Sequence, residues 1–126
     1  MPTDEPTAAS PFLEPGSATV EDFRRLDLRV GRIVSAAPLA AARQPAYRLE
    51  IDFGPAGRRS SSAQLTQTYP DPKLLHGRLV VAVVNLPARR VAGFRSEVLV
   101  LGALAPGGEV PLLSLDERAQ PGQRVG

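Results

Sequence analysis

Three arginines, Arg89, Arg90 and Arg95, lie close together between two strongly apolar segments, residues 79–86 and 96–102. A guanidinium group cannot lose its charge, and its planar fork of donors fits a phosphate group. Segments this rich in valine and leucine are typical of strands that are covered on both faces, and such strands hold the loop between them rigidly. The pattern therefore predicts the binding of a phosphate-rich partner.

Other polar residues near these segments are candidates for the same interface. Arg58 and Arg59 follow a GPAG turn at residues 54–57, where a solvated hairpin tip is an equally good interpretation. Asn85 ends an apolar strand, and its amide suits either the edge of a base or a loop carbonyl group. Ser96 begins the next strand and is equally suited to orienting the loop.

The sequence shows no catalytic or metal-binding pattern. It contains no cysteine, and the single histidine, His76, has no carboxylate at a ligand spacing, so we expect it to be structural. The serines at residues 60–62 have no partner arranged for nucleophilic catalysis, and no phosphate-loop motif occurs. We therefore expect no enzymatic activity, no cofactor and no metal.

The net charge of +2 hides an asymmetry along the chain. Residues 1–22 contain five of the thirteen acids and no base, which leaves fifteen bases against eight acids in residues 23–126. Four prolines also fall within the first fifteen residues, a composition that disfavours a packed core. We predict a flexible acidic tail over residues 1–18 and one folded, basic domain over residues 19–126.

Hydrophobic alternation predicts mostly strands in this domain. Thr19 is expected to cap a helical turn at residues 20–25, with Phe23 and Leu26 docking inward. Gly31 is expected to mark a bulge or a sharp bend in the first strand. The predicted strands are residues 26–34, 47–53, 59–66, 79–86, 96–102 and 110–115, with a short helix at residues 73–76 between the third and fourth.

Short strands in this order, with one small helix between the third and fourth, favour an all-β fold. The commonest such arrangement is the five-stranded OB-fold, a Greek-key barrel, which presents one face and a few loops to its ligands. The strands at residues 79–84 and 98–101 are apolar on both faces, although a lone barrel needs only one apolar face. Homodimerisation is the simplest way to bury the second face.

Several segments in the right order give the chain a specific resemblance. LDLRVGRIV at residues 26–34, PAYRLEIDFG at 45–54, SSAQLT at 61–66, VVNLPAR at 83–89 and SEVLVLG at 96–102 resemble the tRNA-binding OB-fold family. The PAY, SSAQ and SEVLVLG segments are most similar to its stand-alone CsaA branch. The resemblance covers residues 22–125 and leaves out the N-terminal tail.

The resemblance implies a bacterial, cytoplasmic homodimer that binds tRNA without catalysis, and CsaA-type proteins are also described as chaperones of exported preproteins. Residues 19–126 would then be the tRNA-binding OB-fold domain. The positions that correspond to tRNA-facing residues of the family are Asn85, Arg89, Arg90, Arg95 and Ser96, with Arg32 as a further candidate; Arg58 and Arg59 are additional candidate phosphate contacts.

Two other functions remain open from the sequence. The first is a chaperone of unfolded preproteins, which would bind extended peptides in an apolar groove at the dimer interface. The export machinery would be a further partner. The candidate residues of this groove are Tyr69, Leu86 and Phe94. A small subunit of a larger assembly would bind neither ligand alone. Tyr47 and Phe53 fall on the core side of their strand, so Phe94 and Tyr69 are the exposed aromatic candidates.

We expect a cytoplasmic protein without membrane insertion, because no leader or spanning segment is recognisable.

Overall fold

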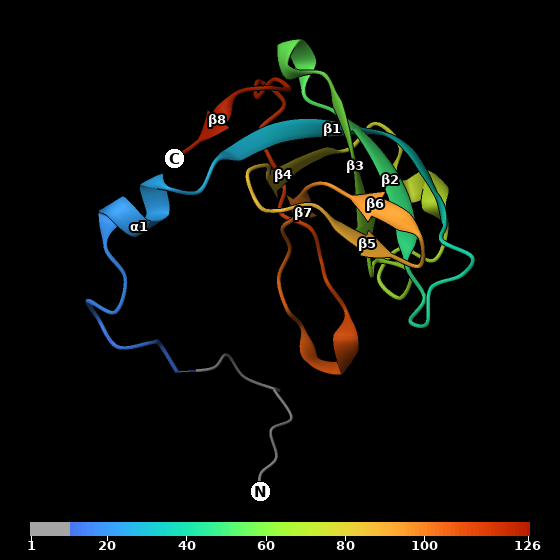
Figure 1. The fold of residues 1–126 in the computed structure, drawn as a ribbon, viewed down its shortest axis with the longest axis horizontal. Coiled ribbons are helices and arrows are strands. Elements are labelled where there is room, and N and C mark those ends of the chain that lie inside the picture. The colour runs from blue at the N-terminus through green and yellow to red at the C-terminus, as the bar shows by residue number, and fades with distance from the viewer. Residues whose placement is uncertain (1–10) are drawn as a thin grey trace, which may run out of the picture.

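A computed structural model describes residues 11–126. Most of the predicted tail therefore lies outside the described residues, and residues 11–18 are all exposed. The predicted all-β OB-fold barrel is confirmed (Figure 1). Its elements are α1 (Val20–Arg24), β1 (Leu28–Pro38), β2 (Tyr47–Asp52), η1 (Gly54–Ala56), β3 (Arg58–Ala63), η2 (Pro72–Leu75), β4 (Leu79–Val83), β5 (Arg89–Val91), β6 (Phe94–Ser96), β7 (Leu99–Val100), η3 (Pro106–Gly108) and β8 (Arg124–Val125), where η denotes a 3-10 helix.

The sheet is organised around the long strand β1. The strand order is β3-β2-β1-β4-β7, all antiparallel, and β8 also pairs with β1. The register of β1 against β2 shifts between Ile33 and Ser35, so the bulge lies three residues after the position predicted for it. Gly31 instead pairs regularly with Val80, and a Cβ there would come within 2.5 Å of the Ile51 side chain. Glycine is thus required at this position for packing and not for a bend.

The barrel closes through a seam between β3 and the segment from β6 to β7. The Ser61 hydroxyl is fully buried and donates to the Val98 carbonyl at 2.8 Å. Ser60 donates from its hydroxyl to the Arg95 carbonyl at 2.7 Å, and its own carbonyl accepts from Glu97 and Val98. The three serines that lacked a catalytic partner in the sequence therefore lie in β3 as part of this seam.

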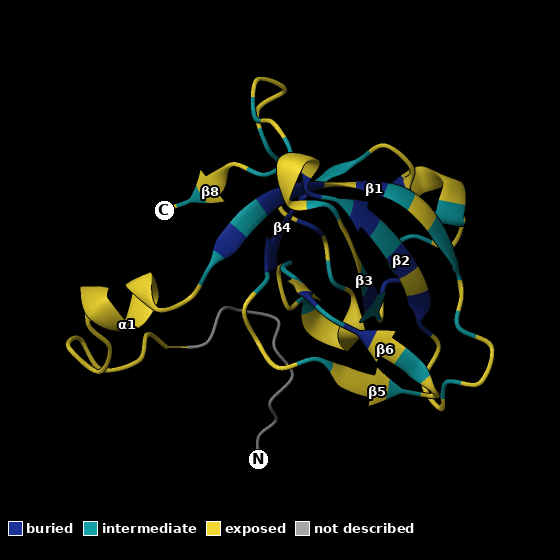
Figure 2. Cartoon of the chain, turned by 45° about the horizontal axis from the view of Figure 1, so that its top comes forward, coloured by how far each residue is buried: buried dark blue, intermediate teal, exposed yellow. Residues whose placement is uncertain are grey.

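Apolar side chains form two clusters on opposite faces of the sheet. Figure 2 shows the buried residues concentrated in β1, β2 and β4. The inner cluster fills the barrel and includes Tyr47 and Phe53, as predicted. The outer cluster consists of Leu28, Val81 and Val83, and Leu115 and Val125 of the chain's own C-terminal segment pack against it. The second apolar face of β4 is thus covered in part within one chain, which weakens the sequence argument that a dimer must cover it.

Several element boundaries differ from prediction. β4 ends at Val83, because the chain then turns toward the hairpin described below. The predicted strand at residues 110–115 is reduced to a single bridge between Gly102 and Leu112, and β8 was not predicted. Of the predicted strand at residues 96–102, only the last residue of β6 and the two residues of β7 are in strands. The third predicted strand, residues 59–66, ends at Ala63 in the structure.

The N-terminal helical turn is confirmed, but its predicted packing is wrong. The Thr19 hydroxyl accepts from Asp22 N–H at 3.0 Å and the Asp22 carboxylate accepts from Thr19 N–H at 2.9 Å, a complete capping box. Phe23 is nevertheless 45 % exposed and Leu26 is 38 % exposed. Helix α1 stands away from the barrel (Figure 1). No helix among residues 11–126 has the length and hydrophobicity that crossing a membrane requires.

Candidate nucleic-acid interface

The three arginines lie on a β-hairpin, where the sequence predicted a loop. β5 pairs with β6 through Arg89↔Ser96, Arg90↔Arg95 and Val91↔Phe94. Ala92 and Gly93 form the two-residue turn, with φ values of 52° and 82°. Two residues with positive φ are the requirement of a type I′ turn, whose twist matches the twist of paired strands. Glycine meets this requirement freely, whereas alanine does so at a cost.

The hairpin presents its arginines on two faces. Residues directly opposite each other in an antiparallel pair share one face, and neighbours along a strand alternate. Arg90 and Arg95 therefore share the face opposite to that of Arg89, Phe94 and Ser96. Because Ser96 is only 6 % exposed, its face is the one turned toward the barrel. The predicted cluster of three is thus two outward cations and one inward cation.

The outward pair places two positive charges directly opposite each other. Arg90 and Arg95 are both exposed. Arg90 Nη1 donates to the Gly93 carbonyl at 3.0 Å, and Arg95 Nε lies 3.6 Å from Glu97 Oε2, with its side chain 62 % exposed. Like charges at opposite positions destabilise a strand pair. One long, exposed ion pair neutralises little of this charge, so both guanidinium groups remain accessible to an anion.

Glu97 connects the hairpin to β3 and to a second pair of arginines. Its carboxylate accepts from Ser60 N–H at 3.0 Å and from the Ser60 hydroxyl at 3.1 Å. These bonds, chiefly the backbone one, lower the pKa of Glu97, and the charges of Arg95 and Arg59 lower it further. Arg59 therefore lies near the base of the hairpin, and its neighbour Arg58 is also exposed.

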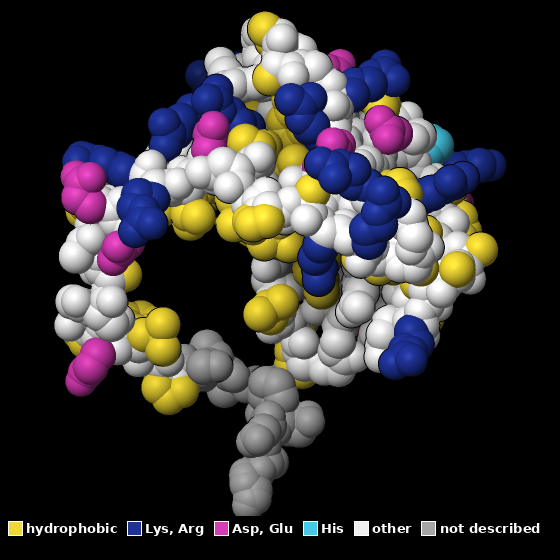
Figure 3. Space-filling model, in the orientation of Figure 1, with side chains coloured by type: hydrophobic (Ala, Val, Ile, Leu, Met, Phe, Trp, Pro, Cys, Tyr) yellow, Lys and Arg dark blue, Asp and Glu magenta, His cyan; other side chains and the backbone are white. Residues whose placement is uncertain are grey.

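Together, Arg58, Arg59, Arg90 and Arg95 define what we call the basic surface. Figure 3 shows Lys and Arg side chains gathering over this side of the barrel, around β3 and the hairpin. Three carboxylates border this surface: Glu97 is hydrogen-bonded to Ser60, Asp52 lies directly opposite Arg58, and Asp27 lines a pocket with Arg59; of the four arginines, only Arg95 forms a salt bridge within residues 11–126, and its partner is Glu97. An array of fixed cations on strands, with little internal neutralisation, is suited to contacting successive phosphates.

Two predicted site residues have structural roles. Asn85 donates from its side-chain amide to the Arg25 carbonyl at 2.8 Å and accepts from Asp27 N–H at 2.8 Å. Both halves of the amide thus fix the junction of α1 and β1, the loop-carbonyl interpretation that the sequence left open. Ser96 is buried, and its hydroxyl accepts from Ser62 N–H at 2.9 Å. We therefore leave both residues out of the basic surface.

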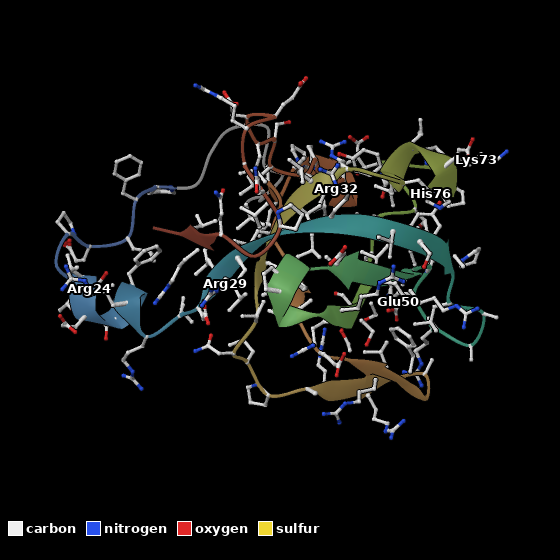
Figure 4. The ribbon with its side chains drawn as sticks, turned by 90° about the horizontal axis from the view of Figure 1, so that it is seen from above. Arg24, Arg29, Arg32, Glu50, Lys73 and His76 are labelled. Atoms are coloured by element: carbon white, nitrogen blue, oxygen red, sulfur yellow. The ribbon has the colours of Figure 1, made fainter. Side chains whose placement is uncertain are left out.

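Arg32 is separated from the hairpin. Its guanidinium donates to the Gly77 carbonyl at 2.8 Å and lines a hollow with Arg78 and Glu117. Figure 4 shows Arg32 and Glu50 on opposite sides of β1. Arg32 therefore lies apart from the hairpin, although the register Arg32↔Asp52↔Arg58 places it on the same face of the sheet as Arg58, two strands away.

The candidate peptide contacts lie in three different places. The Tyr69 hydroxyl accepts from Leu112 N–H at 3.0 Å, and the centre of its ring lies 5.2 Å from the Arg78 guanidinium carbon. Both the hydroxyl and the ring of Tyr69 therefore already contact other residues of the chain. Leu86 is 39 % exposed and lines a groove of about 490 Å³ with Pro87, Ala88, Val98 and Leu99. This apolar groove is bordered by two charged residues, Arg89 and Glu97. Phe94 lies in a separate groove under the hairpin.

Sequence reasoning missed the hairpin and the residues beneath it. The signal was present as VAGF at residues 91–94, where glycine occupies the second position of a two-residue turn. Alanine at the first position obscured it, because Asn-Gly and Asp-Gly are the typical pairs. Arg48 and Glu50 were assigned only to a charged strand face, although both line the groove that contains Phe94.

Comparison with known proteins identifies the family of this domain. The family described as "Putative tRNA binding domain" matches residues 28–124. The methionine–tRNA ligase of Xanthomonas axonopodis pv. citri is 36 % identical over 116 residues, 92 % of this chain and 17 % of the ligase. That of Neisseria meningitidis serogroup B is 33 % identical over 127 residues, 94 % of this chain and 18 % of the ligase. The chain thus spans less than a fifth of these curated relatives, and the matched family is a tRNA-binding domain, not a catalytic one.

Solved structures give a closer match over the whole length of the other chain. The chaperone CsaA of Bacillus anthracis superposes with a TM-score of 0.82 and 49 % identity, covering 88 % of this chain and 100 % of that one. The CsaA chaperone of Picrophilus torridus gives a TM-score of 0.79 and 40 % identity, with coverages of 86 % and 99 %. From the fold, the family match and these similarities, the chain belongs to the tRNA-binding OB-fold domain family and is of the CsaA type.

Proposed function

We propose that this protein binds tRNA without catalysis, as a homodimer, and that the basic surface contacts the RNA phosphates. The observation that supports this proposal is the exposed Arg90–Arg95 pair at directly opposite hairpin positions. Such a pair costs stability in the free protein, and a bound phosphate between the two guanidinium groups would reverse that cost. Folded RNA presents its phosphates at regular spacing, which suits a fixed array of cations.

The experiment is a titration of tRNA against the protein and against an Arg90→Glu/Arg95→Glu variant at several salt concentrations. Two lost phosphate contacts should weaken binding by at least about 100-fold and lower the slope of log K against log salt by roughly two. Arg118→Glu is the control for a charge reversal elsewhere on the surface, because the Arg118 side chain is 91 % exposed and lies on the C-terminal segment. Equal losses in both variants, or none in either, would rule out the basic surface as the site.

A dimer is supported by apolar residues that this chain leaves exposed. Helix α1 has no buried residue although its capping box is complete. Val20 is 63 % exposed, and Phe23 faces no core of its own chain. Figure 3 shows hydrophobic side chains along the opening between the N-terminal segment and the barrel. A second copy of the chain that packs α1 against this region would bury them.

Light scattering coupled to size-exclusion chromatography tests this part of the proposal. The protein is expected to elute with the mass of two chains, and Phe23→Glu should shift it toward one chain. The control is Glu21→Gln, which changes the exposed polar side of the same short helix. A wild-type mass of one chain would contradict the dimer and would leave the basic surface untouched.

A second function, chaperoning of unfolded preproteins, is favoured by one specific feature. The apolar groove that Leu86 and Leu99 line is open, and both side chains are about two-fifths exposed at 39 % and 45 %. An extended apolar segment would cover them. Peptide binding there should be nearly independent of salt, whereas tRNA binding should weaken steeply as salt rises.

Leu86→Ser/Leu99→Ser should weaken peptide binding and leave tRNA affinity within about twofold. Joint loss of both ligands would mean that one surface serves both. We further propose that the protein works in the bacterial cytoplasm, where tRNA and nascent preproteins are both present. Fractionation of cells that produce a tagged full-length protein tests this location directly.

A further inference from the structure

A second groove lies beneath the hairpin, beside the basic surface. It has a volume of about 400 Å³ and is lined by Ser35, Ala37, Arg48, Leu49, Glu50 and Phe94. Strands β1 and β2 form its floor, and β6 passes above them. A volume of this size is at the small end of ligand pockets in proteins. It accommodates one planar group and does not accommodate a folded element.

Phe94 gives the groove an aromatic face. It shares the inward face of the hairpin with Arg89 and Ser96, and it is partly exposed. The next residue along the chain is tied to β3, because the Arg95 carbonyl accepts from the Ser60 hydroxyl at 2.7 Å. The backbone that carries the ring is therefore anchored to β3 by the seam. A partly exposed ring on an anchored strand is suited to stacking with a nucleobase.

Glu50 gives the groove a carboxylate with unused acceptors. It lies on the outward side of β2, directly opposite Ser35 on one neighbouring strand and Ser60 on the other. Within residues 11–126 its side chain takes part in no salt bridge and no hydrogen bond to another side chain or to the backbone. An ionised carboxylate is an acceptor only, with two oxygens side by side. Its natural ligand is a group with two neighbouring donors.

We propose that this groove binds an unpaired guanine base of the RNA held by the basic surface, which rests on the proposed tRNA function. Guanine alone among the four RNA bases has two adjacent donors, N1–H and the N2 amino group, on its Watson–Crick edge. Both bond to the Glu50 carboxylate while the purine stacks on Phe94. Cytosine, adenine and uracil each offer only one donor along that edge.

The surrounding charges fit a nucleotide better than an apolar peptide. A base under Phe94 leaves its sugar and phosphate at the mouth of the groove. Arg48 lines that groove and supplies a cation for the phosphate. An apolar side chain in the same place would desolvate Glu50 without giving it a partner, which costs free energy.

A tryptophan in place of Phe94 makes a direct reporter, because the chain contains no tryptophan. Phe94→Trp keeps an aromatic ring in the groove. Guanosine monophosphate should quench its emission on stacking, and ribose 5-phosphate should not. Cytidine and uridine monophosphates should bind at least about tenfold more weakly than guanosine monophosphate, because each loses a charge-assisted hydrogen bond. Equal quenching by all nucleotides would overturn the assignment of guanine.

Glu50→Gln in the Phe94→Trp background separates base recognition from charge. The amide has one acceptor and one donor, so guanosine monophosphate affinity should fall about tenfold. Ribose 5-phosphate affinity, measured by competition with tRNA, should rise slightly because a negative charge is gone. A lower affinity for guanosine monophosphate together with a higher affinity for ribose 5-phosphate would support the proposal. If both affinities rose, or both fell, the proposal would be overturned.

Two further outcomes distinguish this inference from the function on which it rests. Loss of tRNA binding on reversing Arg90 and Arg95, without quenching by guanosine monophosphate, overturns the guanine subsite and supports the basic surface. Undetectable tRNA binding by the wild-type protein overturns both. Quenching by an unfolded apolar peptide but not by the nucleotide would assign the groove to the peptide and overturn the inference.

Discussion

The six-stranded main sheet and the β5–β6 hairpin differ in how they treat polar groups and backbone conformation. In the sheet and its seam, buried polar groups are paired, and no buried side-chain nitrogen or oxygen in residues 11–126 lacks a partner. In the hairpin, Arg90 lies opposite Arg95 and Ala92 adopts a positive φ. Figure 2 shows the hairpin far more exposed than β1, β2 and β4. Unfavourable charge pairs and strained backbone conformations tend to occur at functional sites. We therefore interpret the sheet as the scaffold and the hairpin as the binding element.

The largest effect is expected in the sheet, from Gly31→Ala. The new methyl group would lie 2.5 Å from Ile51 Cγ2 and 2.7 Å from Phe53 Cε1, both in the inner core. Overpacking of this kind costs about 1–3 kcal/mol of unfolding free energy. Urea denaturation measures this loss, and the tRNA affinity of the remaining folded protein should not change. If the variant were as stable as wild type, the core would be able to rearrange around the extra methyl group, which would contradict the interpretation of the sheet as a rigid scaffold.

The next effect is expected at the seam, from Ser61→Ala. This change leaves the Val98 carbonyl without the hydroxyl that donates to it, at a cost of about 1–3 kcal/mol. Ser62→Ala is the matched control one residue away, since the Ser62 hydroxyl makes no hydrogen bond within the described chain and the change leaves its backbone N–H and carbonyl in place. If both variants lost the same stability, side-chain bonding would not be what closes the barrel.

A pH dependence is expected at the junction of the two regions. Hydrogen bonds from Ser60 lower the pKa of Glu97 below its ordinary value of 4.5. The folded state therefore favours the ionised form, so this contribution to stability is complete above pH 4.5 and is lost as pH falls through the lower folded pKa. Glu97→Gln should reduce the acid-induced fall in the urea midpoint. If the urea midpoint of the variant fell with pH below 4.5 as steeply as that of wild type, this would argue against the role of Glu97 in joining the hairpin to the seam.

The smallest effect is expected in the hairpin turn. Ala92→Asn places a residue that tolerates positive φ at the first turn position, which should stabilise the protein by about 0.5–1 kcal/mol. Gly93→Ala is the opposite control and should destabilise it, because φ at residue 93 is 82°. Thermal unfolding measures both. Stabilisation by alanine at residue 93 would mean that the turn is not of the type inferred.

The fold was more predictable from the sequence than the site was. Alternation at residues 47–53 identified β2 and its core side, because one buried face imposes a period of two on the sequence. The hairpin was taken for a loop because its strands are three residues long and too exposed for a hydrophobic period. Asn85 and Ser96 were assigned by type and position, and their hydrogen-bond partners lie far away in the sequence, where no local pattern indicates them.

The packing of the second apolar face shows the same limit. Strand periodicity correctly indicated that β4 is apolar on both sides, but it could not tell which segment covers the outer side. Leu115, the last residue of the predicted strand at 110–115, and Val125, where no strand was predicted, do so. Long-range contacts of this kind are set by topology and not by local composition.

Arg90→Glu tests the central claim most directly. The change creates an opposite-charge pair with Arg95 across the hairpin, so the unfolding free energy should rise by about 0.2–1 kcal/mol. The same change removes a phosphate contact, so tRNA affinity should fall by roughly tenfold or more. Measured on one preparation by urea denaturation and tRNA titration, stability and affinity should move in opposite directions. Unchanged tRNA affinity in a stabilised protein would contradict the claim that this hairpin keeps its like charges in order to bind RNA.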